Sequence, residues 1–194
     1  MYREFVQLRG RIGKESFGRL LVRVRFCEEM VGKVDSGAVK MPLAEPKKTI
    51  TLTLSQQNDL LETANNHYFK GNYKKSAKDY LLVVKSGGEL DGDHYGRLAQ
   101  SLYEDKNLEE AVYYYWRAVE GSPTSQLWSY NLAKALFDLN DFPGATSVYK
   151  TAILLDPSDA DSLYNLGHIH QKLCQWDAAL LSYEKAISAD STLY

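Results

Sequence analysis

The sequence predicts an all-α fold, a right-handed superhelical solenoid of about four helix-turn-helix repeats, preceded by a small β-rich segment. Two observations predict the solenoid. Small and aromatic residues recur at a step of 34 residues, with a weaker first copy that begins near Gln57, and a proline follows two of the copies. A third observation narrows the class: the chain contains no run of about 18 apolar residues, so no membrane span is predicted.

The N-terminal part differs from the rest in charge and in hydrophobic period. Residues 1–49 carry 11 Lys and Arg against 6 Asp and Glu, a net charge of +5, whereas residues 50–194 carry 12 against 19, a net charge of −7. Residues 20–26 and 50–54 alternate with the period of two that is typical of strands, and 36–41 are a third short candidate. We therefore predict a basic, β-rich segment over 1–54.

The basic segment could bind nucleic acid or lipid, or it could be a strand face that is solvated or docks onto a repeat surface. Arg23 and Arg25 would share one face of a strand, but the only nearby aromatic residues are Phe17 and Phe26. Nucleic-acid binding usually needs more aromatic interleaving than this. The sequence therefore favours a solvated strand face, or a strip that docks onto an acidic repeat surface of this chain or of a neighbour, over a nucleic-acid or lipid partner.

The composition of the chain limits both its structural class and the cellular compartment that we expect. The chain has 194 residues, of which 44% are hydrophobic and 25% are charged, and this balance excludes wholesale disorder. Its two cysteines, Cys27 and Cys174, cannot supply a disulfide framework. We expect a cytoplasmic protein. The Arg-rich, acid-poor first residues leave import into an organelle as an alternative.

The repeats are defined by columns of small and aromatic residues. Alanines are small enough to let paired helices approach, tyrosines fill the space between them, and proline ends a pair. The columns are Ala111, Ala145 and Ala179; Tyr115, Tyr149 and Tyr183; Ala118, Ala152 and Ala186; and Pro123 and Pro157. With a weaker first copy, the array covers 57–194, in repeats of about 57–91, 92–125, 126–159 and 160–194.

Each repeat is expected to contain two helices. Ser125 and Asp159 are the expected N-caps of two of them. We predict helix pairs at 57–70 and 74–85, 92–105 and 108–120, 126–139 and 143–155, and 160–173 and 176–189.

These columns resemble the tetratricopeptide repeat (TPR) family, whose pattern places Leu-Gly and an aromatic residue in the first helix and Ala-x-x-x-aromatic in the second. The last copy shows Leu166-Gly167, Ala179 and Tyr183. It departs from the pattern with His170 at the first-helix aromatic position and Ser191 in place of proline.

The resemblance implies a concave groove lined by the first helix of each pair. Asn131 and Asn165 are expected to make amide contacts with the backbone of an extended partner peptide, and positive side chains beside them would suit an acidic one. The alternative is an array that acts as a spacer with solvated side chains. The predicted peptide-binding residues are Asn65, Arg97, Gln100, Tyr130, Asn131, Lys134, Tyr164, Asn165 and His168.

One TPR subclass clamps the C-terminal carboxylate of heat-shock chaperones with a defined set of Lys, Asn and Arg. Of that set only Asn65 is matched here, because Leu61 and Arg97 stand at two of the other positions and Leu127 and Asn131 at the last two. The resemblance therefore does not favour a co-chaperone.

No constellation of residues predicts catalysis, a metal or a cofactor. Residues 13–18 resemble the glycine-rich loop of kinases, but Glu15 replaces a glycine and no catalytic loop follows. His170 and Cys174 are four residues apart, yet two ligands make no closed zinc site. We expect His170 to pack against the second helix and Cys174 to be a small buried residue.

The predicted function is that of a non-catalytic protein-interaction adaptor or scaffold. The alternative is a structural or accessory subunit, or the TPR part, of a larger enzyme or complex. Leu180, Tyr183 and Ile187 on the last predicted helix have no following repeat to cover them, so a homodimer or a larger assembly through this end is a further expectation.

Overall fold

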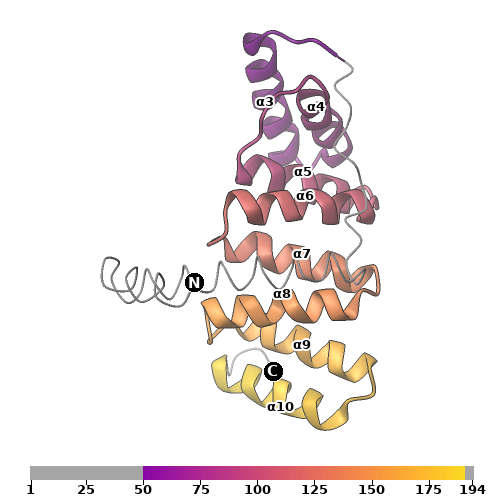
Figure 1. The fold of residues 1–194 in the computed structure, drawn as a ribbon, viewed down its shortest axis with the longest axis vertical. Helices are drawn as coiled ribbons and strands as arrows, with labels where there is room; N and C mark the ends of the chain where they lie inside the picture. The colour runs from indigo at the N-terminus through magenta and orange to yellow at the C-terminus, as the bar shows by residue number, and fades with distance from the viewer. Residues whose placement is uncertain (1–49, 191–194) are drawn as a thin grey trace, which may run out of the picture. The chain divides into compact units, whose positions relative to one another are not determined.

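The computed structural model describes residues 50–190, except for the side chain of Leu155. These residues form eight α-helices and no strand (Figure 1). All eight predicted helices are present, and seven of them begin and end within one residue of the prediction. The predictions made for residues 1–49 lie outside the described part of the chain. The helices are α3 (Leu54–Phe69), α4 (Tyr73–Lys85), α5 (Gly92–Glu104), α6 (Leu108–Gly121), α7 (Gln126–Asp138), α8 (Phe142–Leu155), α9 (Ala160–Lys172) and α10 (Trp176–Ala189).

The predicted strand at 50–54 is wrong, because a capping box starts a helix there. The Gln56 amide donates to Thr53 Oγ1 at 3.3 Å, and the Thr53 amide donates to Gln56 Oε1 at 2.9 Å. These two bonds satisfy N–H groups that a helix start leaves without partners. Helix α3 therefore begins at Leu54, three residues before the predicted start.

The first helices of the other pairs begin at single polar caps. Asp91, Ser125 and Asp159 each accept a hydrogen bond from the backbone amide three residues later. The predicted caps Ser125 and Asp159 are therefore confirmed. A cap of this kind contributes about 1 kcal/mol to helix stability, so these side chains set where each repeat begins.

The turn inside each pair repeats the same backbone conformation. The second of its three residues has a left-handed φ of 57–72°, and the next amide donates to the carbonyl five residues back, which closes the end of the first helix. Glycine occupies this position in the first pair, whereas the later pairs carry side chains there. The four residues are Gly71, Lys106, Asn140 and Cys174.

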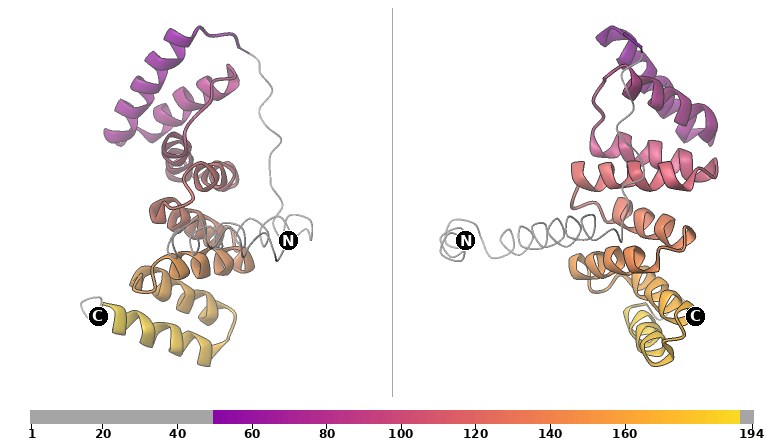
Figure 2. Two further views of the ribbon diagram at one scale, coloured as in Figure 1. Left: turned by 60° about the vertical axis from the view of Figure 1, so that its left-hand side comes forward. Right: turned by 45° about the vertical axis from the view of Figure 1, so that its right-hand side comes forward.

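The chain forms two compact units, whose boundary falls inside α8. In the unit that ends at Tyr149, α3 packs against α4, α4 against α5, α5 against α6, and α6 against α7 (Figures 1 and 2). Tyr80, Tyr115 and Tyr149 are buried between helices, as the period predicts. In the unit that begins at Lys150, α9 packs against α10, and the equivalent Tyr183 is half-buried.

Candidate protein-interaction face

Three first helices, α3, α5 and α7, are joined by side-chain hydrogen bonds that step from one repeat to the next. We call this set of side chains the polar face. It contains five of the predicted binding residues, four of which these bonds connect directly, and it adds two neighbours on the same helices, Tyr103 and Asp138. Its members are Asn65, Arg97, Gln100, Tyr103, Asn131, Lys134 and Asp138.

The first step joins α3 to α5. Asn65 Oδ1 accepts from Arg97 Nη1 at 2.8 Å and from the Tyr80 hydroxyl at 2.6 Å. Asn65 Nδ2 lies 3.3 Å from His94 Nε2. Burial, acting against a smaller opposing effect of Arg97, raises the pKa of Tyr80 to about 12, so this hydroxyl stays a donor. The Arg97 guanidinium, 5.5 Å from the centre of the Phe69 ring, is thus held by a neutral amide and an aromatic face.

The second step joins α5 to α7 in the same way. Gln100 Oε1 accepts from the Tyr115 hydroxyl at 2.9 Å and from Asn131 Nδ2 at 3.2 Å. Gln100 Nε2 donates to Glu104 Oε1 at 2.9 Å. Gln100 lies 35 residues after Asn65, and in both repeats a buried tyrosine of the second helix holds the amide oxygen. The repeat therefore fixes the orientation of these amides as well as their positions.

The third step places a tyrosine between opposite charges. The Tyr103 hydroxyl donates to Asp138 on α7, and Lys134 Nζ lies 5.2 Å from the centre of the Tyr103 ring. Burial, then the bond to Asp138 and the nearby charge of Glu104, raise the pKa of Tyr103. Sequence reasoning missed Asp138, a member of this face, and Glu104, which accepts from the face residue Gln100. Their spacing of 34 residues, the repeat step, is the signal that could have found them.

Trp128, which the sequence did not single out, packs between α5 and α7. The Trp128 ring lies so close to Gly96 that a Cβ atom there would overlap it, and its Nε1 donates to Asp93 Oδ1 at 2.9 Å. Tyr130 packs edge-on against Tyr149, with ring centres 6.0 Å apart. Trp128 is buried and Tyr130 is half-buried, so packing against neighbours holds both rings in place beside the face.

In the unit that contains α9 and α10, three of the predicted residues lie on α9. Tyr164 and His168 are in contact, with ring centres 4.8 Å apart, and both rings pack against Tyr183. Asn165 Nδ2 donates to the Asp161 carbonyl at 2.8 Å. This amide group therefore contacts its own helix, whereas that of Asn131 contacts the neighbouring Gln100.

A shallow hollow of about 360 Å³ adjoins the turn between α3 and α4. Two lysines and two carboxylates are among the residues that line it, so it is a mixed-charge surface. Its lining is Gly71, Asn72, Tyr73, Lys74, Lys75, Glu104 and Asp105.

Within residues 50–190, no three His, Cys, Asp or Glu side chains gather as metal ligands. His170 Nδ1 lies 2.7 Å from Gln175 Oε1.

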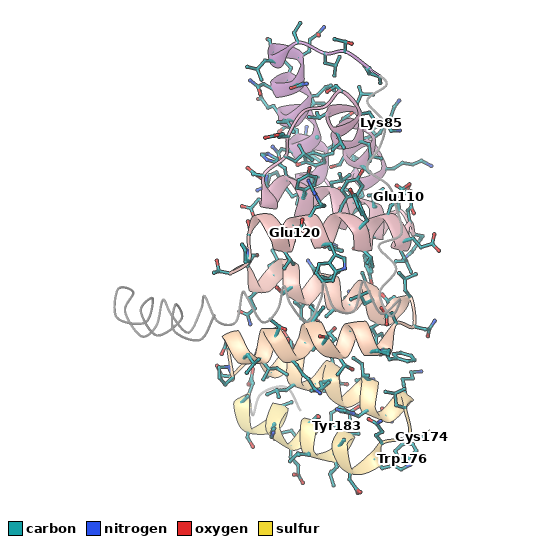
Figure 3. All side chains as sticks on the ribbon, viewed as in Figure 1. Lys85, Glu110, Glu120, Cys174, Trp176 and Tyr183 are labelled. Atoms are coloured by element: carbon teal, nitrogen blue, oxygen red, sulfur yellow. The ribbon has the colours of Figure 1, made fainter. Side chains whose placement is uncertain are left out.

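The expectation of a buried Cys174 is wrong. This residue is exposed, because it occupies the left-handed turn position between α9 and α10, where Figure 3 shows it beside Trp176. No described helix is long and apolar enough to cross a membrane.

Comparisons with known proteins agree with this architecture. Residues 133–173 match a family model described as TPR repeat, and residues 61–125 and 160–193 match models described as tetratricopeptide repeat. The Arabidopsis thaliana protein named Protein CTR9 homolog is 24% identical over 133 residues, which are 66% of this chain and 12% of that protein. The chain thus spans about an eighth of that relative's length.

Two solved structures show the same fold. The crystal structure of YrrB, described as a TPR protein with an unusual peptide-binding site, has a TM-score of 0.66 at 21% identity and covers 91% of this chain and 84% of its own. The MamA protein has a TM-score of 0.66 at 21% identity, with 73% and 76% of the two chains covered. The packed helix pairs and their recurring positions define a helical repeat protein. The chain belongs to the tetratricopeptide repeat family, whose fold is typical of protein-interaction adaptors.

Proposed function

We propose that this chain is a non-catalytic adaptor that binds an extended peptide segment of a partner protein along its first helices. The observation that carries the proposal is the polar face itself. Its positively charged side chains, Arg97 and Lys134, make contacts with rings and a neutral amide, not ion pairs with carboxylates, within the described residues. Cations held in place without a neutralising partner can contact a ligand without first breaking a salt bridge.

The amides of the face support the same proposal. Asn131 uses Nδ2 to bind Gln100, which holds the side chain in one orientation, and an amide group also has an oxygen that accepts. An oriented amide costs less conformational entropy to engage than a free one. YrrB, which shares the fold, is described as having a peptide-binding site, and this likeness supports the kind of ligand without specifying the residues.

We propose the remaining predicted residues as further contacts with the partner peptide. Tyr130 supplies rigid aromatic area beside Asn131, and Tyr164, Asn165 and His168 are the proposed contact residues of the unit that contains α9. Rigid tyrosines give large contact area at low entropic cost.

A direct test uses a phage-displayed library of linear random peptides selected against the full chain. A selected peptide, labelled with fluorescein, then serves as the probe in anisotropy titrations. We expect Asn131→Ala combined with Asn165→Ala to weaken binding of that probe by about tenfold, since each lost hydrogen bond contributes about 0.5–1.5 kcal/mol. The matched control is Asn66→Ala, an exposed asparagine of α3 outside the polar face.

The thermal unfolding midpoint separates binding from folding. If the double variant unfolds many degrees earlier than the wild type, the amides are structural and the proposal fails. Equal binding by the double variant and the control would contradict it as well.

A second candidate function, that of a structural subunit, is favoured by the exposed apolar surface of α10. Trp176, Leu180, Leu181 and Ile187 are all exposed. Apolar surface of this kind commonly marks an association site. Sedimentation of the full chain and of Leu180→Asp distinguishes this candidate: a concentration-dependent assembly that the substitution abolishes would support it, and a monomer at all concentrations would oppose it.

A further inference from the structure

The neighbours of the Asn65 amide fix which of its two ends is the oxygen. Arg97 Nη1 lies 2.8 Å from Asn65 Oδ1, and a guanidinium group only donates hydrogen bonds. The atom that faces Arg97 must therefore be the oxygen, which leaves the amide nitrogen, Nδ2, 3.3 Å from His94 Nε2. Because an amide nitrogen also only donates, His94 Nε2 has to accept and carries no proton in this arrangement.

The other ring nitrogen of His94 determines where the ring proton lies. Nδ1 is 2.8 Å from Asp91 Oδ1, the carboxylate oxygen that also caps α5 by accepting from the His94 backbone amide. A carboxylate accepts, so Nδ1 carries the proton and donates it. His94 is therefore neutral here, and it connects the cap of α5 to the amide that holds Arg97.

A second proton on His94 is incompatible with this set of hydrogen bonds. When a proton from water enters at Nε2, that atom becomes a donor and faces the donor Nδ2 of Asn65. Rotating the amide by about 180° turns its oxygen toward His94 but places Nδ2 opposite Arg97 Nη1, which again brings two donors together. The Tyr80 hydroxyl fits either orientation, because a hydroxyl both donates and accepts. Beside a charged His94, Asn65 can therefore bind His94 or Arg97 but not both.

Both ends of this connection can respond to the solvent. The His94 side chain is 22% exposed, so protons reach it, and Arg97 is half-buried. The other contact of the Arg97 guanidinium is the ring of Phe69, 5.5 Å away, which is itself largely exposed. A guanidinium that loses the amide oxygen is thus free to turn into solvent.

The charges around His94 act in opposite directions. Asp91 favours the charged ring, whereas Arg97, held one amide away, disfavours it. The Tyr80 ring, centred 6.0 Å from that of His94, stays neutral, because burial raises the pKa of Tyr80 to about 12. Titratable groups of the packed helices that interact with other parts of α5 are Tyr68, Tyr114, Tyr115, Arg117, Lys134 and Asp138.

We propose that His94 is a positioning residue of the polar face: neutral His94 keeps the Asn65 oxygen on Arg97, and protonated His94 releases Arg97. Peptide binding then weakens as the pH falls from about 7.5 to about 5.5, the range in which histidine changes its charge, because a released guanidinium has to be ordered again when the peptide binds. This effect on binding rests on the proposed peptide-binding function, whereas the coupling of His94 to Arg97 does not.

Nuclear magnetic resonance of the full, isotope-labelled chain tests the coupling without a ligand. Two-bond correlations between ring protons and ring nitrogens distinguish a proton on Nδ1 from one on Nε2, and we expect the Nδ1–H form of His94 at about pH 7.5. As the pH falls, carbon-detected relaxation of Arg97 Nε should change from ordered to mobile with the midpoint of the His94 titration. An Nε2–H ring at neutral pH, or an Arg97 side chain whose mobility does not follow His94, would overturn the proposal.

Anisotropy titrations test the effect on binding. The probe is the peptide selected from the library, labelled with tetramethylrhodamine because that dye does not titrate in this range. His94→Gln offers Asn65 an acceptor oxygen that cannot be protonated. The matched control is His67→Gln, since His67 also lies 2.8 Å from a carboxylate, that of Asp79, but is outside the polar face. Between about pH 7.5 and 5.5, the wild type and the control should each lose about two- to tenfold more affinity than His94→Gln, as expected for one hydrogen bond.

Comparing the three chains cancels the titration of the peptide and of His168, which they share. Circular dichroism at both pH values checks that each chain is folded, and the resonance measurement on the wild type decides the coupling if a variant is not. If His94→Gln loses as much affinity as the wild type, the effect on binding is excluded while peptide binding itself stands. If no library peptide binds, the proposed function fails, and the behaviour of Arg97 alone supports or overturns the role of His94.

Discussion

Helices α6 and α10 are the second helices of their pairs and carry apolar residues at equivalent positions, yet their burial differs sharply. Val112 and Val119 on α6 are each 3% exposed. Leu180 and Ile187, which lie 68 residues further on and thus two repeats later, are 60% and 46% exposed. Helix α6 packs against both α5 and α7, whereas α9 is the helix that packs against α10.

The difference shows that a repeat position predicts which side of a helix is apolar but not what covers that side. Each repeat buries its apolar side against a neighbour, so the stability of an array is close to a sum over adjacent pairs. The same residue type therefore contributes much in α6 and little in α10. The exposed positions of α10 remain available for association instead.

The largest expected effect comes from placing a charge at the two equivalent positions. Val112→Asp buries an unpaired carboxylate between packed helices and should lower the free energy of unfolding by about 3–5 kcal/mol. Leu180→Asp adds a solvated charge and should change it by less than about 0.5 kcal/mol. Urea unfolding followed by circular dichroism measures both. Similar losses in the two variants would mean that α10 is covered as completely as α6, and the comparison would be wrong.

The repeat period explains why the helices could be predicted so closely. Ala111, Tyr115 and their equivalents pack against neighbouring helices, so their spacing is fixed by helix geometry and is visible in the sequence. The strand predicted at 50–54 failed for a local reason. The period-two pattern there belongs to the four residues that precede helix α3, and the hydrogen bonds between Thr53 and Gln56 decide where the helix begins.

The candidate face could be predicted only in part. The periodicity places Asn65, Gln100 and Asn131 on first helices, and they lie there. It does not reveal that Gln100 binds Asn131 or that Asn165 donates to its own helix, because the contacts of long polar side chains depend on neighbours in space. The packing of Trp128 against Gly96 was likewise unpredicted, since it joins residues of different repeats.

Replacing two glycines of first helices should have a smaller effect on stability, and it compares the same two regions of the molecule. Gly96→Ala would push a methyl group into the buried Trp128 ring, and Gly167→Ala would push one into the half-buried Tyr183 ring. Alanine favours a helix over glycine by about 1 kcal/mol, which offsets part of the overlap. We expect a net loss of about 1–3 kcal/mol for Gly96→Ala and a smaller loss for Gly167→Ala, because an exposed ring edge can shift.

Hydrogen exchange followed by mass spectrometry assigns these losses to regions. Protection should fall in α5 and α7 for Gly96→Ala, and in α9 and α10 for Gly167→Ala. A larger loss for Gly167→Ala would show that the Tyr183 ring is held as tightly as the Trp128 ring.

The smallest expected effect is that of glycine substitutions in the turns, which test the backbone energy of one residue apart from helix packing. Lys106 and Cys174 occupy the same left-handed turn position, one beside well-covered helices and one beside α10, and both are exposed. A side chain in this conformation costs about 1 kcal/mol relative to glycine. Lys106→Gly and Cys174→Gly should therefore each raise the free energy of unfolding by about 0.5–1 kcal/mol, and Asn140→Gly by less, because asparagine tolerates the conformation better. Since the cost lies in one residue's own backbone, the two larger gains should be equal despite the different packing. A gain at Cys174 without one at Lys106 would show that the turn and the helices around it are not independent.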